Sequence, residues 1–164
     1  MHHNNYNFDQ VEWLRIVDVS CKDYKIDFKY SLLGYDLKLN RLDMLLNYAP
    51  GNSHCRRHRH IASTMTIVLE GEQHLTEFQA NGSTKKIVRK KGDYALAECD
   101  ALPHNEHGGL NGGTVILSLF SPDGNLFEYF DDKSDDRWIV SIEDFVNNWK
   151  KGVTYGGKPN MISK

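Results

Sequence analysis

Most apolar segments of this chain are short and are rich in β-branched or aromatic residues. They include KIDFKYSLLGY at 25–35, RLDMLLNYA at 41–49, TMTIVLEG at 64–71, GGTVILSLFS at 112–121 and NLFEYF at 125–130. Turn-forming groups of Gly, Pro, Asn and Asp separate them, at 50–52, 81–83, 91–93, 108–113 and 122–124. Short strands at this spacing are typical of an antiparallel sandwich or barrel. The pattern therefore predicts an all-β fold.

The sequence EGE at 70–72 lies between two strand-like runs, 64–71 and 72–78. A glycine between two such runs favours a tight hairpin, because glycine adopts a positive φ without steric cost. We therefore expect the chain to reverse direction at Gly71.

One segment near the end of the chain has a helical rather than a strand-like period. In SIEDFVNNWKKG the apolar residues recur at helical spacing, at Ile142, Phe145, Val146 and Trp149. Ser141 and Asp144 form a capping-box pattern, and Gly152 follows two lysines as a stop signal. We expect a helix over about 141–151, packed outside a core barrel of about 25–130. With 164 residues the chain is expected to be a single domain, 1–164.

Charge and hydropathy exclude several classes of partner. The 20 Lys and Arg residues are balanced by 22 Asp and Glu residues, and this net charge of −2 argues against a nucleic-acid binder. The basic run KKIVRKK at 85–91 alternates with apolar residues, as on the solvated face of a strand. No apolar stretch is long enough to cross a membrane, and the polar N-terminus does not resemble a signal peptide. We expect a cytoplasmic protein.

Histidines gather just before one of the apolar runs, in HCRRHRH at 54–60. If 58–68 is a strand, His58 and His60 project from the same face as Thr64. Two imidazoles at this spacing can bind one metal ion, although histidine pairs also occur on solvated strands. His54 and His74 are interpreted as surface residues, and the arginines between the histidines as a solvated rim.

A third histidine follows in PHNEHGG at 103–109. Strands that are distant in sequence meet across a small barrel, so His104 is expected to complete a metal site with the pair. His107 is the alternative third ligand, but its opposite parity lets only one of the two face inward. Glu106 shares the parity of His104, and it is a fourth ligand, a partner that orients an imidazole, or an exposed residue. A zinc site of Cys55, Cys99 and the histidine pair is a further alternative.

These residues resemble the cupin superfamily. In its first motif a glycine precedes H-x-H and a second glycine ends the motif, as Gly51, HRH at 58–60 and Gly71 do here. In the second motif a histidine follows a glycine by about eleven residues, and His104 lies twelve residues after Gly92. The resemblance covers about 45–120. It lacks the proline-x-glycine of the second motif, where Glu98 and Asp100 stand instead.

The resemblance implies a double-stranded β-helix, a jelly-roll barrel, with extra N-terminal strands, in a homodimer. Thr64 stands where many cupins have a glutamate ligand, which implies a charge-neutral site of His58, His60 and His104. Such a site resembles the acetylacetone- and dihydroxyacetophenone-cleaving dioxygenases and certain zinc-binding anti-sigma factors. The implied cofactor is a divalent metal, Fe(II) by preference, with Zn, Ni or Mn as alternatives.

The implied function is cleavage of a C–C bond in a small diketone-like or hydroxyketone-like substrate by an Fe(II)-dependent dioxygenase. The alternatives are a non-catalytic sensory or ligand-binding cupin and a cupin isomerase or lyase. The residues do not identify the substrate.

Overall fold

The computed structural model describes residues 10–19, 21–131 and 136–152. In this part of the chain it contains ten strands and one helix, which confirms the all-β prediction with a C-terminal helix. Their bounds are β1 Leu14–Asp18, β2 Ile26–Asp36, β3 Arg41–Tyr48, β4 His58–His60, β5 Ser63–Phe78, β6 Thr84–Lys90, β7 Tyr94–Ala97, β8 His104–Phe120, β9 Asn125–Phe130, β10 Arg137–Ser141 and α1 Ile142–Lys150.

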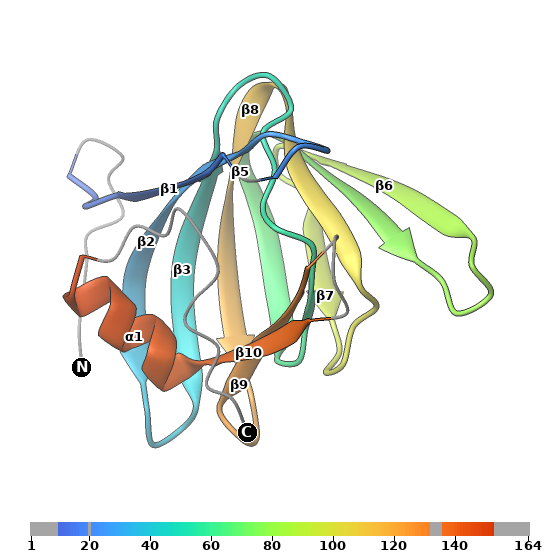
Figure 1. Ribbon diagram of the computed structural model, residues 1–164. Helices are drawn as coiled ribbons and strands as arrows, with labels where there is room; N and C mark the ends of the chain where they lie inside the picture. The colour runs from blue at the N-terminus through green and yellow to red at the C-terminus, as the bar shows by residue number, and fades with distance from the viewer. Residues whose placement is uncertain (1–9, 20, 132–135, 153–164) are drawn as a thin grey trace.

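The two long strands β5 and β8 form the centre of a curled antiparallel sheet (Figure 1). They pair with each other along most of their length, from Ser63 opposite Phe120 to Glu77 opposite His104. The other edge of β8 is shared, because its C-terminal half pairs with β3 and its first residue pairs with β4. Strands β9 and β10 continue from β4, and β2 and β1 continue from β3. This division of partners curls the sheet around one apolar core.

The hairpin predicted at EGE is wrong, and so is the turn predicted at 108–113. β5 runs without reversal through Gly71, and β8 runs through the glycine-rich segment opposite it. Gly71 does have the expected positive φ, of 63°. It lies in a bulged region of the β5–β8 pair, with register shifts between Val68 and Glu70 and between Gly71 and Gln73. The positive φ therefore serves a bend within one strand rather than a chain reversal.

This bulged region changes which residues face the core. On β5 the buried positions are Thr64, Thr66 and Val68 before it, and Gln73 and Leu75 after it. β8 makes the same change, from even positions at its start to odd positions at its end. A single extra residue in a strand reverses its alternation, so no single period describes either strand.

The helix α1 begins and ends where the sequence predicts. The Ser141 hydroxyl accepts a hydrogen bond from the backbone N–H of Asp144, whose carboxylate accepts one from the backbone N–H of Ser141. Val146 and Trp149 are buried, and the Trp149 ring lies 5.5 Å from that of Tyr30 in β2. The helix therefore closes one side of the apolar core.

We expect Asp27→Asn to lower the free energy of unfolding by about 2 kcal/mol, in the range for hydrogen bonds to charged groups. The buried Asp27 carboxylate accepts two hydrogen bonds from the Arg15 guanidinium, of 2.8 and 2.9 Å, which tie β1 to β2. These bonds lower the pKa of Asp27. Their contribution is complete above the ordinary carboxyl pKa of about 4 and is lost as the pH falls through the lower folded value.

The measurement is urea denaturation of both proteins in a chelator, at pH 7 and at pH 3. The difference between the unfolding free energies of the wild-type protein and D27N should be smaller at pH 3 than at pH 7. The exposed Asp23→Asn change on the preceding loop is the control and should have little effect at either pH. A D27N difference that is the same at both pH values would contradict the ion-pair explanation.

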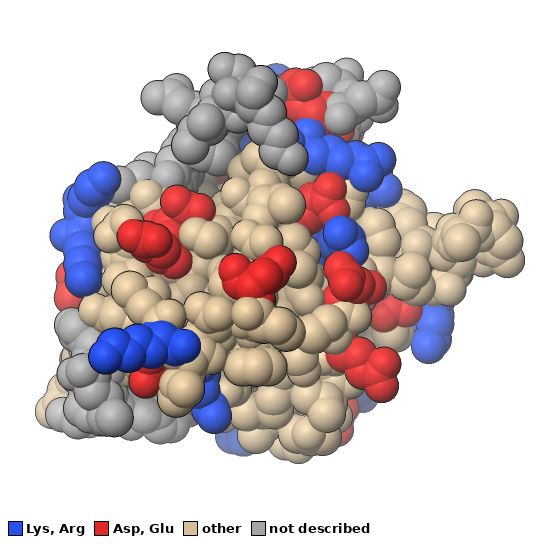
Figure 2. Space-filling view, turned by 90° about the horizontal axis from the view of Figure 1, so that it is seen from below, with Lys and Arg blue, Asp and Glu red and all other residues tan. Residues whose placement is uncertain are grey.

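Charged side chains of both signs are interspersed over the described part of the face in Figure 2, which carries no large area of one sign. Strand β6, from the basic run, is mostly exposed, as expected, and among the strands in the described part of the chain it pairs with β5 alone. Among the described residues, no helix has both the length and the apolar character needed to cross a bilayer. The homodimer stays a prediction.

Candidate metal centre

Strand β4 carries His58 and His60 into the core between β8 and β9. His58 lies opposite His104 of β8, and His60 lies opposite Phe127 of β9. The predicted strand 58–68 is interrupted at Ile61 and Ala62, but its alternation continues, and Thr64 is buried on the same face. All three histidines are buried, with at most 6% of each exposed. The predicted trio is therefore brought together.

Hydrogen bonds to Nδ1 orient each imidazole. His58 Nδ1 lies 2.7 Å from the carbonyl oxygen of Arg56, and His104 Nδ1 lies 2.9 Å from that of Leu102. His60 Nδ1 lies 2.8 Å from the Thr64 hydroxyl, which itself donates to the carbonyl oxygen of Ala62. Carbonyl oxygens only accept, and the Thr64 proton is already used, so each Nδ1 carries the proton. Each Nε2 therefore presents a lone pair.

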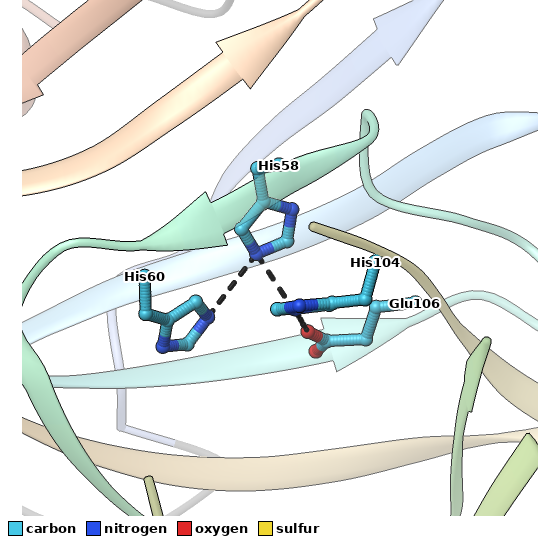
Figure 3. Close-up of side chains that lie close together, drawn as sticks. All are labelled: His58, His60, His104 and Glu106. Atoms are coloured by element: carbon cyan, nitrogen blue, oxygen red, sulfur yellow. Dashed lines mark hydrogen bonds and ion pairs between the residues drawn. The ribbon is translucent and has the colours of Figure 1, made fainter. Parts of the chain in front are cut away.

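The Nε2 atoms converge on one point (Figure 3). Those of His58 and His60 are 3.2 Å apart, and that of His104 is buried with no hydrogen-bond partner. Because the protons are on Nδ1, this short contact brings two hydrogen-bond acceptors together. A cation bound between them would remove the repulsion between their lone pairs. The cluster therefore has the donor arrangement that a metal ion requires.

Glu106 of β8 adds a carboxyl group to the cluster. Its Oε2 lies 3.5 Å from His104 Nε2 and 3.8 Å from His58 Nε2, and the four donor atoms lie within 4.8 Å of one another. The cluster therefore contains an acidic group that the implied three-histidine set lacks, and this group comes from β8 rather than from position 64. Complete burial raises the pKa of Glu106 to about 8, and a bound divalent ion would favour its charged form.

Burial has the opposite effect on the imidazoles. Desolvation, with a smaller contribution from neighbouring His104, lowers the pKa of His58 to about 3. Desolvation likewise lowers the pKa values of His60 and His104. The rings are therefore neutral at physiological pH, the form that binds metal.

The remaining histidines lie elsewhere. His107 faces away from the cluster and stacks between His54 and His74, at ring distances of 4.5 and 4.9 Å, so its part in the cluster is excluded. His54 and His74 are half-buried in this stack rather than surface residues. The alternative Cys–His zinc site does not form, because Cys55 is buried in the core and Cys99 is exposed. Neither belongs to the donor cluster found in the described residues.

Two of the three arginines of the predicted rim, Arg56 and Arg59, pair with acidic groups, whereas Arg57 lies over the Phe78 ring at 4.2 Å. Arg59 pairs with Glu128 and, at 2.8 Å, with Asp100, and Arg56 pairs with Asp18. Of these acids, Asp18 is itself buried. Arg56 and Arg59 therefore take part in the structure of the rim rather than standing free in solvent.

A small cavity of about 50 Å³ adjoins the cluster. His58, His60 and Glu106 are among the residues that line it. Most of the other lining residues are apolar or aromatic, and they include Phe28, Leu46, Leu117, Phe127 and Tyr129. No lysine or arginine lines it among the described residues. It would accept a small, largely apolar molecule.

Sequence reasoning missed two polar residues beside Glu106. Gln73 donates to its Oε1 at 3.0 Å, and Arg89 donates to the Gln73 oxygen at 2.9 Å. Both lie in segments where apolar and polar residues alternate, as in a strand with one solvated face. Because the buried positions change from even to odd numbers within β5, the neighbours of Gln73 in the sequence do not show that it is buried.

Solved structures provide the comparison, since no family model and no curated protein sequence matches the chain. An acetylacetone dioxygenase from Acinetobacter johnsonii is 10% identical, with a TM-score of 0.66 and 93% of each chain covered. A protein from Methylibium petroleiphilum PM1, proposed to be an acetylacetone dioxygenase, is 13% identical, with a TM-score of 0.65 and coverage of 91% of this chain and 95% of its own. The chain has the cupin fold. The Fe(II) form of HppE is 17% identical, with a TM-score of 0.54 over 73% of this chain and 60% of its own.

The cupin fold explains why the site is built from β4 and the start of β8. These are the strands that carry the two resembling motifs, and their pairing places His58 opposite His104. The buried His58, His60, His104 and Glu106 fit a divalent metal in donor type and convergence.

We expect Thr64→Val to weaken metal binding about tenfold without emptying the site. The change removes the acceptor of the His60 Nδ1 proton but keeps the volume of the side chain, and loss of such a partner costs about 10–100-fold in affinity. Cobalt titration against a competing chelator measures this. Thr66→Val, one position further along the same buried face, is the control. An empty site in T64V would make the hydroxyl a ligand and contradict the assignment.

Proposed function

We propose that this chain is a mononuclear metal-dependent dioxygenase that cleaves a C–C bond in a small diketone-like or hydroxyketone-like substrate. His58, His60 and His104 hold Fe(II), and Glu106 is the fourth ligand group. The observation that carries the proposal is the convergence of three proton-free Nε2 atoms on a buried carboxyl group.

The cavity and the comparisons support this choice of reaction. The space beside the cluster is small, apolar on most of its wall and lined by no lysine or arginine among the described residues, which suits a small neutral dicarbonyl. Two of the similar structures are an acetylacetone dioxygenase and a protein proposed to be one, and a third contains Fe(II).

Fe(II), when bound, supplies Lewis-acid and one-electron redox chemistry. The residues of the chain orient the reactants and exclude water. Phe28, Leu117 and Phe127 keep the cavity apolar, so the polar end of a dicarbonyl is directed toward the cluster. A diketone is acidic enough to enolise without a strong base, so the chain need supply none, and Glu106 Oε2 serves as the ligand oxygen that faces His58 and His104.

The test is oxygen uptake by protein loaded with Fe(II) under anaerobic conditions. Addition of pentane-2,4-dione should consume about one dioxygen per diketone and release one acetate and one 2-oxopropanal, which together contain all the carbon and both atoms of the dioxygen. Zinc-loaded protein and His60→Ala should be inactive. Protein that binds iron but consumes no oxygen with a panel of β-diketones and hydroxyketones would contradict the proposed reaction.

A second measurement reports whether the metal is accessible. Nitric oxide added to the iron-loaded protein should give a high-spin iron–nitrosyl resonance, because four protein ligands leave up to two positions open. A missing resonance that appears in Glu106→Gln would mean that the carboxylate closes the site. The sensory or structural alternative would then replace the dioxygenase.

A further inference from the structure

Gln73 of β5 lies where β5 pairs with both β6 and β8, and its side chain contacts Glu106. Gln73 is opposite Gly108 of β8 on one side and opposite Arg89 of β6 on the other, and Leu75, two residues later, is opposite Glu106. Gly108 has no side chain, and Tyr48 occupies the space beside it, with its Cβ 2.7 Å from where a Gly108 Cβ would lie. The Gln73 side chain, only 2% exposed, reaches diagonally to Glu106.

The hydrogen bonds of Gln73 have a fixed direction. A guanidinium can only donate, so the 2.9 Å contact from Arg89 requires the Gln73 amide oxygen on that side. The amide N–H₂ group must then point toward Glu106, where Nε2 donates to Oε1 at 3.0 Å. With Oε1 engaged, Oε2 is the oxygen that faces His58 and His104.

We propose that Gln73 is a positioning residue that presents Glu106 Oε2 to the metal, and that Arg89 of the β5–β6 hairpin sets the orientation of its amide. The inference rests on the proposed metal site but not on the dioxygenase reaction.

A neutral amide is suited to this position. A guanidinium in direct contact with Glu106 would form a buried ion pair that competes with the cation for the carboxylate charge. An intervening glutamine orients the carboxylate and leaves its charge for the metal. The half-buried Arg89 is separated from Glu106 by the Gln73 amide, and it lies on β6, which pairs with β5.

A double-mutant cycle tests the coupling. Gln73→Met keeps the volume but removes both hydrogen bonds, and Glu106→Gln removes the carboxylate. Co(II) affinity is measured by chelator competition, and the Co(II) absorption bands report the ligand set. We expect Q73M to weaken Co(II) binding about tenfold and to shift the bands toward those of E106Q. In the E106Q background, Q73M should change the affinity by less than about twofold.

Several outcomes would overturn the proposal. If Q73M weakened Co(II) binding equally in the wild-type and E106Q backgrounds, Gln73 would act through general packing. An unchanged Co(II) affinity in Q73M would also contradict the proposal, as would a wild-type chain that binds no Co(II). Thermal denaturation of each variant separates loss of fold from loss of metal. A wild-type chain that binds Co(II) and shows the coupling but consumes no oxygen would overturn only the dioxygenase reaction.

Variants of Arg89 provide a test that leaves the core intact. Arg89→Met should cause part of the loss of Co(II) affinity and part of the band shift expected for Q73M. Arg89→Lys keeps a hydrogen-bond donor, so its Co(II) affinity and absorption bands should be close to those of the wild-type protein. Lys86→Met removes a charge of the same sign from an exposed position on β6 and is the matched control. If K86M weakens Co(II) binding as much as R89M, the effect is one of net charge and the proposed role of Arg89 is wrong.

Discussion

Replacing His60 with alanine should leave the purified protein without stoichiometric metal, whereas the unaltered chain should carry about one divalent ion. His60 contributes one of three buried Nε2 atoms, and its own Nδ1 is held by Thr64. Loss of a partner of a ligand already costs about 10–100-fold in affinity, so loss of the ligand itself should cost at least about 100-fold. Elemental analysis of protein purified without added metal gives the stoichiometry, and Co(II) titration gives the affinity.

The matched control is His107→Ala, which removes an imidazole from β8 but on the opposite side from the cluster. His107 stacks with His54 and His74, so H107A should retain the metal. His104→Ala, three residues earlier, should lose it. If H60A retains full metal content, or if H107A loses metal and H104A does not, the assigned site is wrong.

The second large effect is expected at Gly113, where alanine should destabilise the fold by about 3 kcal/mol or more. A Cβ added at Gly113 would lie 2.1 Å from the backbone oxygen of Glu72, and neither backbone can yield without breaking the β5–β8 pairing. Overpacking in a well-packed site costs about 1–3 kcal/mol, and a contact with backbone leaves little room for relaxation. Urea denaturation and the yield of folded protein measure the effect.

Gly82→Ala is the control that separates the steric cost of this contact from the conformational cost of replacing a glycine. Gly82 lies in the β5–β6 turn with a φ of 82°, and a Cβ there meets no atom within 4 Å. Gly82→Ala should therefore lower the free energy of unfolding by about 1–2 kcal/mol, which is the cost of placing a non-glycine residue in a left-handed conformation. Gly113 is not among the positive-φ glycines, so its cost should be steric. Equal losses in the two variants would show that the close approach of β5 and β8 does not govern stability.

Local patterns were sufficient for the C-terminal helix and for the faces on which the histidines lie. The capping signals at Ser141 and Asp144 and the apolar period after them placed α1 correctly. Period-two alternation placed His58 and His60 on one face and separated His104 from His107. These features depend on neighbours within a few residues, where backbone geometry alone sets the direction of each side chain.

Glu106 shows where such reasoning ends. Parity placed it on the face of His104 but left open whether it joined the site. Its contact with the cluster depends on the pairing of β8 with β4, and its orientation depends on Gln73. Strand β4 and Gln73 are both distant from Glu106 in the sequence, so the residues around Glu106 do not indicate either contact.

The sequence by itself determined an all-β chain with a C-terminal helix, and it determined which histidines share a face, because steric periodicity is local. Only the tertiary structure decided that EGE continues a strand and that the glycines at 108–113 do not end one. Isolated glycines favour a turn, but here two glycine-containing segments lie against each other, and their close approach, with the bulge, keeps both strands continuous. That contact reverses the alternation of β5 and brings Gln73 inside, and it exists only once strands far apart in the sequence have paired.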